Sequence, residues 1–154
     1  MGAGILEDSQ WVTELLNGTI TALKNVVPIK PKIAPPEIQD TDLELSYGVL
    51  IGFTGDLKGN LVIRGDLQTF GAIGQEMFGM PLQDEMLRSF TGEFGNMLAG
   101  SLATLVSLKG WETDITAPTI VQGQSTLSGY EKSIKLPIVY DQLGNLDIFL
   151  MMKQ

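Results

Sequence analysis

The stretch Ser89-Phe-Thr-Gly-Glu93-Phe-Gly-Asn96-Met-Leu-Ala-Gly100 has the periodicity of a helix with one buried face. Glu93 and Asn96 are three residues apart, so they are neighbours on a helix surface outside the apolar stripe. The members of that stripe are Leu87, Phe94, Leu98, Leu102 and Leu105. The pattern predicts a helix from about residue 83 to residue 108 that presents a carboxylate and an amide on one side.

Small residues surround this polar pair. Ser89 lies one turn before Glu93, and Gly92, Gly100 and Ala103 flank the same stripe. A glycine inside a helix costs up to about 1 kcal/mol relative to alanine, but a surface without side-chain bulk lets another molecule come close. We therefore expect this side of the helix to be a docking face.

The composition is that of a packed globule, and we expect a single domain over residues 1–154. Hydrophobic residues make up 44% of the chain and charged residues 18%, and a chain of this size buries roughly two-thirds of its unfolded surface. The net charge is -8 without a long basic run, which argues against nucleic acid or an anionic membrane as the main partner. No apolar run approaches the ~20 residues of a membrane span and no secretory signal pattern is present, so we expect a cytoplasmic protein.

Cysteine and histidine are absent from the sequence. This excludes disulfides, thiolate chemistry, a Ser-His-Asp triad and imidazole metal sites or proton shuttles. Glycine-rich phosphate-loop and dinucleotide fingerprints are also missing. An enzyme with this sequence must work with carboxylates, amides and hydroxyls, and we expect the chain to bind no metal or cofactor of its own.

The first third of the chain predicts a helix followed by an extended segment. Residues 9–27 read as an amphipathic helix with Ser9 as N-cap and Pro28 as its stop. Three prolines in residues 29–38 predict a connector or an edge segment rather than a central strand. The buried side of the helix is expected at Trp11, Val12, Leu15, Leu16, Ile20, Leu23 and Val26.

A hairpin is predicted next, from a strand over residues 43–53 and a second over residues 61–64. Gly55 and Gly59 lie between them, and glycines in such a loop can also indicate a phosphate-binding site. Because no lysine-serine pair follows, we favour turn glycines over a nucleotide site.

The remaining elements complete an α+β fold. Residues 66–78 predict another helix, ended by Gly79 and Pro81. Its apolar side is Leu67, Phe70, Ile73, Met77 and Phe78. Strands are predicted at residues 115–121, 132–140 and 146–152, with a hairpin turn at 141–145. The order of elements predicts an antiparallel β-sheet packed against about three long helices.

The spacing Ser89-x-x-x-Glu93-x-x-Asn96-Met97, with Gly100 after it, resembles the signature of the CheC/CheX/FliY family of bacterial chemotaxis phosphatases. The segment 110–123 resembles the part of the family that follows the motif helix, and the hairpin with Gly55 and Gly59 also resembles its counterpart. The likeness extends from about Leu45 onward. It implies the α+β fold expected above and, for CheX-type members, a homodimer.

A second copy of the motif is a candidate at Glu14 and Asn17, since CheC-type proteins carry two motifs and CheX-type proteins one. Gln10 stands where serine or aspartate is expected, and the small-residue pattern after Asn17 is missing. We favour an ordinary outward polar face for this helix. The resemblance is therefore to the CheX type.

The resemblance implies a phosphatase that hydrolyses the aspartyl phosphate of a CheY-type receiver domain, with Mg²⁺ held by the receiver. Asn96 would position the attacking water, because an amide is both donor and acceptor and does not repel phosphate. Glu93 would pair with the receiver lysine, and Ser89 would support it through a hydrogen bond. Gly92 and Gly100 would allow close docking, with Met97 at the edge of the contact.

Several alternatives stay open at this point. A non-catalytic CheX-like module could bind a signalling partner through the same helix face, and Glu93 with Asn96 could be ordinary solvated residues. We interpret Met77, Met80, Met86 and Met97 mainly as core residues, with Met97 as the exception. The acidic residues outside the motif lack metal-ligand spacing and are interpreted as solvated: Asp40, Asp42, Glu112 and Asp114. The apolar strand 146–152 would be hazardous as a free edge, so we expect it to pair within the domain or across a dimer.

Overall fold

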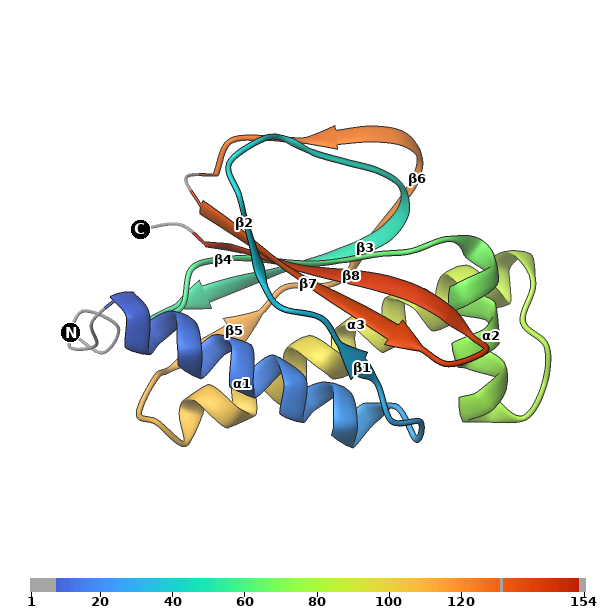
Figure 1. Cartoon of the computed structure of the whole chain (residues 1–154), viewed down its shortest axis with the longest axis horizontal. Coiled ribbons are helices and arrows are strands. Elements are labelled where there is room, and N and C mark those ends of the chain that lie inside the picture. The colour runs from blue at the N-terminus through green and yellow to red at the C-terminus, as the bar shows by residue number, and fades with distance from the viewer. Residues whose placement is uncertain (1–7, 131, 153–154) are drawn as a thin grey trace.

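In residues 8–130 and 132–152, which the computed structural model describes, three helices lie on one side of an eight-stranded antiparallel sheet (Figure 1). The helices are α1 (Asp8–Val26), α2 (Leu67–Phe78) and α3 (Asp84–Ser107). The strands are β1 (Lys32–Ile33), β2 (Glu37–Gln39), β3 (Leu43–Gly55), β4 (Gly59–Arg64), β5 (Thr113–Ile115), β6 (Thr119–Leu127), β7 (Lys132–Tyr140) and β8 (Gly144–Met152). The predicted fold class, α+β with helices packed on an antiparallel sheet, is confirmed.

The strand order is β1-β7-β8-β4-β3-β5, with β2 also paired to β7 and β6 to β3. β3 is the longest strand and changes partners along its length. It pairs with β4 along one edge, and with β6 and then β5 along the other. Its first residues extend beyond β4 and curl with β6 away from the helices (Figure 1).

Alternation along the strands divides the apolar side chains between the two sheet faces. The larger core lies between the sheet and the helices and includes Ile51, Ile63, Phe70 and Phe94. A smaller core fills the space under the curled part of β3 and β6, on the opposite face. Its buried members are Leu43, Leu45, Val62, Phe149 and Met151.

The helix predictions agree with the structure, with bounds that shift by one residue. α2 is capped as its sequence suggests: the Asp66 carboxylate accepts a hydrogen bond from the Thr69 backbone N–H at 2.7 Å, and Gly79 ends the helix with φ 75°. Ser9, however, lies inside α1 and is not its N-cap. The prediction for the Trp11 side chain falls outside the described residues.

The edge-segment and turn-glycine predictions are confirmed. β1 and β2 both pair with β7 at the margin of the sheet. Gly59 has φ 148°, and a Cβ atom there would collide with the Met151 carbonyl oxygen of the neighbouring strand. The positive φ agrees with the hairpin interpretation, and the close approach of β8 is a second reason for glycine at this position.

One strand prediction needs correction. The single strand expected over residues 115–121 is two strands, β5 and β6, because the chain turns at residues 116–118. There the Thr116 hydroxyl accepts a hydrogen bond from the Gly52 backbone N–H at 2.8 Å. The C-terminal strand β8 pairs within the domain, as expected, with β7 on one side and β4 on the other. No helix within the described ranges has the length and apolar character to cross a membrane.

Candidate functional site

α3 is held against the sheet by the apolar stripe that its periodicity predicts. Phe94, Leu98 and Leu102 have no exposed surface. Gly95 faces β3 so closely that a Cβ atom there would lie 2.8 Å from Val49 Cγ1. The helix therefore lies closer to the sheet than a larger residue would allow.

A buried hydrogen bond fixes the rotation of α3 about its axis. The Tyr47 hydroxyl lies 2.7 Å from Thr91 Oγ1, and Thr91 Oγ1 donates to the Leu87 carbonyl oxygen at 2.8 Å. Because Thr91 has one hydroxyl hydrogen, Tyr47 is the donor in the bond between them. Tyr47 also packs edge-on against Phe70 with ring centroids 5.3 Å apart. This polar link joins β3 to the buried side of the motif helix.

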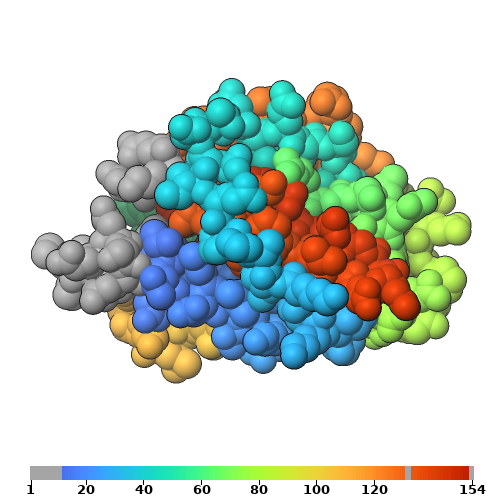
Figure 2. Space-filling view, in the orientation of Figure 1, coloured from blue at the N-terminus to red at the C-terminus, as the bar shows by residue number. Residues whose placement is uncertain are grey.

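α1 covers another side of α3. A Cβ atom on Gly18 would lie 2.8 Å from Leu102 Cδ1, so the two helices are closely packed. Glu14 on α1 binds Lys109 with a carboxylate-to-ammonium distance of 3.6 Å, whereas Asn17 is exposed. In the space-filling view α1 and the β1–β2 segment lie on the face turned toward the viewer, beside the red β7–β8 region (Figure 2). Glu14 thus joins α1 to the segment that follows α3, which agrees with the polar-face interpretation of α1.

The motif residues occupy the uncovered side of α3. Ser89, Glu93 and Met97 are exposed, and Asn96 and Gly100 are partly exposed. The helical repeat brings the polar side chains Ser89, Glu93 and Asn96 to one stripe. Within the described residues, no hydrogen bond or ion pair engages these three side chains. The expected hydrogen bond from Ser89 to Glu93 is therefore not formed in this structure. Their donors and acceptors are open to another molecule.

The two motif glycines differ in their surroundings. Gly92 is buried, and a Cβ atom there would lie 3.6 Å from both Pro118 and Ile120 of this same chain. A methyl group would fit there in ordinary contact, so Gly92 faces the segment that leads into β6 and the packing does not require glycine. A Cβ atom on Gly100 would have Ile115 Cδ1 at 3.9 Å as its nearest neighbour outside the helix. Gly100 is the glycine that leaves room on the open face.

Sequence reasoning missed an apolar surface at the start of α3. Phe78 is 56% exposed, Met80 48% and Met86 53%. Met80 and Met86 are therefore surface residues and not core residues, and the earlier interpretation is wrong for them; Met77 is partly buried against the core. The seven-residue spacing from Met86 to Glu93, which puts both on one helix face, was the signal available in the sequence.

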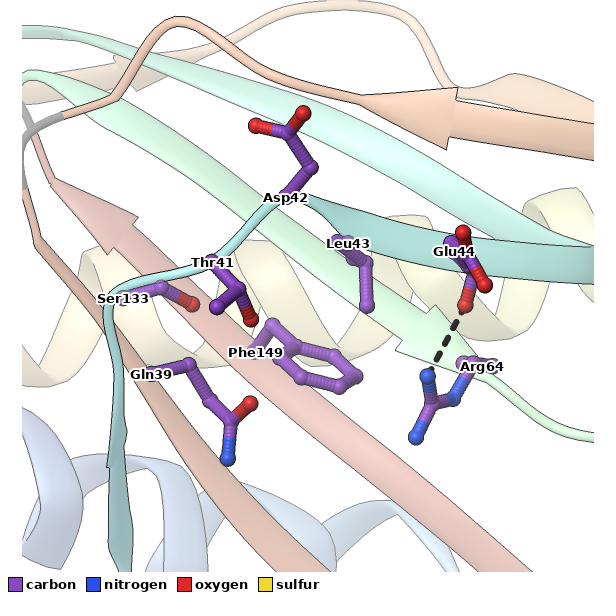
Figure 3. A pocket seen from close by; sticks show the side chains of 8 residues that line it. All are labelled: Gln39, Thr41, Asp42, Leu43, Glu44, Arg64, Ser133 and Phe149. Carbon is purple, nitrogen blue, oxygen red and sulfur yellow. Dashed lines mark hydrogen bonds between the residues drawn. The ribbon is translucent and has the colours of Figure 1, made fainter.

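Two hollows in the described chain have linings without residues of α3. One is a hollow of about 430 Å³ on the sheet face opposite the helices (Figure 3), lined by Gln39, Thr41, Asp42, Leu43, Glu44, Arg64, Ser133 and Phe149. Arg64 is already engaged there: it donates to the Asp147 carboxylate at 2.6 Å and to the Glu44 carbonyl oxygen at 2.9 Å, and its guanidinium lies 4.8 Å from the centre of the Phe149 ring. The other hollow adjoins the N-terminus of α2 and includes Tyr47, Asp66 and Asn145. The motif side chains line neither of these two hollows.

Acidic side chains do not gather into a metal site in the part of the chain that the structure describes: no group of three or more Asp and Glu residues could hold a metal ion. The α3 face offers one carboxylate, from Glu93, and one amide, from Asn96. Chemically, this pair can orient a water molecule and bind a cation presented by a partner.

Comparison with known proteins identifies the family. The family model described as chemotaxis phosphatase CheX matches residues 47–139. A curated relative from Thermotoga maritima, named CheY-P phosphatase CheX, is 30% identical over an alignment of 151 residues that covers 95% of this chain and 97% of the relative. The chain belongs to the CheX family of chemotaxis phosphatases. The CheX-like resemblance inferred from the motif helix is confirmed.

Solved CheX structures share the fold over nearly the whole chain. A chemotaxis protein CheX from Desulfovibrio desulfuricans has a TM-score of 0.77 at 19% identity, covering 92% of this chain and 97% of that one. The CheX–CheY–BeF3–Mg²⁺ complex from Borrelia burgdorferi has a TM-score of 0.76 at 18% identity, with 93% and 97% covered. The CheX-family sheet and helices are therefore retained at low sequence identity.

Proposed function

We propose that this CheX-family protein hydrolyses the aspartyl phosphate of a CheY-type receiver domain that docks on the open face of α3. One observation carries the proposal: Glu93 and Asn96 lie together on a rigidly packed helix, with no partner for either side chain among the described residues. The Thermotoga maritima relative is named a CheY-P phosphatase, and a solved relative is a complex of CheX with CheY. Both support a receiver as the substrate.

In the proposed reaction, Asn96 positions the attacking water molecule. Hydrolysis requires a water oxygen in line with the bond between phosphorus and the aspartate oxygen; that bond breaks, and phosphate and the free aspartate are released. The Asn96 amide oxygen accepts a hydrogen bond from this water, and its NH₂ group donates toward the phosphoryl oxygens. Since phosphoryl transfer depends mainly on positioning and charge stabilisation, one amide on a fixed helix can supply what the receiver lacks.

In the docked complex, Glu93 forms a salt bridge with the receiver lysine. A carboxylate is a poor neighbour for a phosphoryl group that carries negative charge, but it forms a strong charge-assisted hydrogen bond with an ammonium group. Glu93 is three residues from Asn96, so a salt bridge at Glu93 fixes the register of the amide against the phosphate. Mg²⁺ belongs to the receiver in this account and supplies charge stabilisation there.

A docked receiver also gives the remaining motif residues supporting roles. Ser89 lies one turn before Glu93 and is open to hydrogen-bond the partner, while Gly100 leaves space for its backbone. Met97, 37% exposed, contributes apolar contact beside Glu93. Gly92 acts indirectly, through the packing of α3 against Pro118.

We also propose that the protein works in the cytoplasm, where receiver domains are phosphorylated, and that it is a homodimer, as the family resemblance implies. Sedimentation equilibrium of the purified protein tests the dimer, since a monomer mass at micromolar concentration contradicts it.

The test of the proposed function is phosphate release from a Mg²⁺-loaded receiver that has been phosphorylated with acetyl phosphate. The wild-type protein is expected to accelerate release at catalytic concentrations. Glu93→Ala is expected to weaken receiver binding and lower the rate, because it removes the salt bridge that aligns Asn96. Binding to the receiver without any acceleration by the wild type would instead indicate the non-catalytic interaction module.

A further inference from the structure

Three exposed apolar side chains come from the end of α2, the connector after it and the first turn of α3. Phe78 ends α2, Met80 lies in the connector, and Met86 lies in the first turn of α3. Their exposed fractions are 56%, 48% and 53%. We call this surface, defined by Phe78, Met80 and Met86, the apolar corner.

Packed aromatic rings connect the Phe78 side of the apolar corner to the core. Phe78 packs edge-on against Phe90 with ring centroids 5.7 Å apart, and Met86 precedes Phe90 by one helical turn. Phe90 stacks on Phe94 at 5.7 Å, and Phe94 packs edge-on against Phe70 at 6.3 Å. This chain of rings connects the corner to the main core. An exposed surface that is already ordered loses little conformational entropy when a partner covers it.

The apolar corner is continuous with the motif face of α3. Met86 is seven residues before Glu93, so the two side chains share one face and are separated by about 10 Å along the helix axis. Ser89 lies between them. A folded domain that reaches Glu93 and Asn96 along this face also reaches Met86.

We propose that the apolar corner binds an apolar side chain on the surface of the phosphorylated receiver, beside its phosphorylated aspartate. This inference rests on the proposed function and names a second contact for the same partner. A stable interface covers about 800 Å² on each side and has an apolar centre. The motif supplies two polar side chains, a serine, a glycine and one partly exposed apolar side chain, Met97, which covers only a small part of that centre. The corner is the neighbouring surface with the required chemistry, and methionine side chains adapt to an uneven partner.

Acidic side chains beside the apolar corner favour one orientation of the partner. Asp84 and Glu85 lie in the first turn of α3, next to Met86, and both are exposed. Exposed acidic residues around an apolar centre favour a partner surface with basic residues at its margin. The motif carboxylate of Glu93 has the same preference, so the whole face selects for the lysine-bearing side of the receiver.

The test compares Met86→Gln and Met80→Gln with a matched control, Ile38→Gln. Ile38 is 81% exposed on β2, away from α3, and glutamine keeps the side-chain length at each methionine. The probe is a CheY-type receiver loaded with Mg²⁺ and beryllofluoride, and the measurement is the dissociation constant. Loss of an interface anchor predicts a rise of about fivefold or more for Met86→Gln and Met80→Gln, and no change for Ile38→Gln.

The outcomes separate this inference from the proposed function. The single-turnover hydrolysis rate at saturating protein is expected to stay at the wild-type value in both methionine variants, because the corner does not touch the reacting atoms. Unchanged dissociation constants in both variants, with a wild type that binds and hydrolyses, would overturn the proposed binding role of the corner. The proposed phosphatase function would still stand. Weaker binding by the variants, with no hydrolysis by the wild type, would support the binding role of the corner and overturn the proposed phosphatase function.

Discussion

Tyr47 and Thr91 join β3 to the buried side of α3 through hydroxyl oxygens 2.7 Å apart. Thr91 is two residues before Glu93, which is about 200° around the helix. The bond therefore lies opposite the motif face, and it determines which side of α3 is presented to solvent.

Replacing Thr91 tests this link. Thr91→Val keeps the side-chain shape but leaves the buried Tyr47 hydroxyl without its acceptor, so the free energy of unfolding should fall by about 1–3 kcal/mol. Thr91→Ser keeps the hydroxyl and should lose much less. Urea unfolding followed by tryptophan fluorescence measures both variants. Equal stability of Thr91→Val and Thr91→Ser would show that the bond does not contribute.

Gly95 and Gly92 provide a matched pair of glycine-to-alanine changes within one helix. A Cβ atom at Gly95 would lie 2.8 Å from Val49 Cγ1, whereas at Gly92 the nearest atoms are 3.6 Å away. Gly95→Ala should destabilise the fold by about 1–3 kcal/mol through overpacking. Gly92→Ala should stabilise it by up to about 1 kcal/mol, because alanine is the better helix former. Thermal unfolding decides the order, and a Gly95→Ala protein as stable as Gly92→Ala would contradict the close packing on β3.

The raised pKa of Tyr140 predicts how the stability of the fold responds to alkaline pH. Burial raises the pKa of Tyr140 above its ordinary value of about 10. The unfolded chain then loses the phenol proton at a lower pH than the folded protein, so stability falls as the pH rises above about 10, by up to about 1.4 kcal/mol per pH unit. Burial, together with the Asp42 carboxylate, also raises the pKa of Tyr130, which adds to the same trend.

Tyr140→Phe should reduce this alkaline slope. At neutral pH it should be at least as stable as the wild type, because the buried Tyr140 hydroxyl has no hydrogen-bond partner in the described part of the chain. Guanidinium unfolding at pH 7 and pH 11 gives both quantities. The same slope in wild type and variant would mean that Tyr140 is not the titrating group.

Much of the fold was predictable because local and global signals agree. The apolar period of α3 places Phe94 and Leu98 on the sheet side, where both are buried. Asp66 and Gly79 mark the ends of α2 through capping chemistry that depends only on neighbouring residues. The place of β8 between β7 and β4 was not predictable in this way, since strand order is a property of the whole sheet.

In the candidate site too, features set by neighbouring residues were predictable and features set by distant parts of the chain were not. Glu93 and Asn96 are predicted on one face by their spacing, and the structure places them there. The environment of Gly92 depends on Pro118, which comes from a distant part of the chain. Met86 shares the face of Glu93 by its spacing, but Met80 lies in the connector, where no periodicity indicates whether a side chain is covered.

Single-turnover hydrolysis with Asn96→Ala is the direct test of whether Asn96 positions the water that hydrolyses the receiver's aspartyl phosphate. A phosphorylated, Mg²⁺-loaded CheY-type receiver is mixed with excess wild type or variant, and binding of each to the beryllofluoride-loaded receiver is measured alongside. If Asn96 positions the water, the rate is expected to be at least about 100-fold lower for Asn96→Ala, with a dissociation constant close to that of the wild type. A variant that hydrolyses at the wild-type rate, or that loses rate and binding by the same factor, would contradict the role assigned to Asn96.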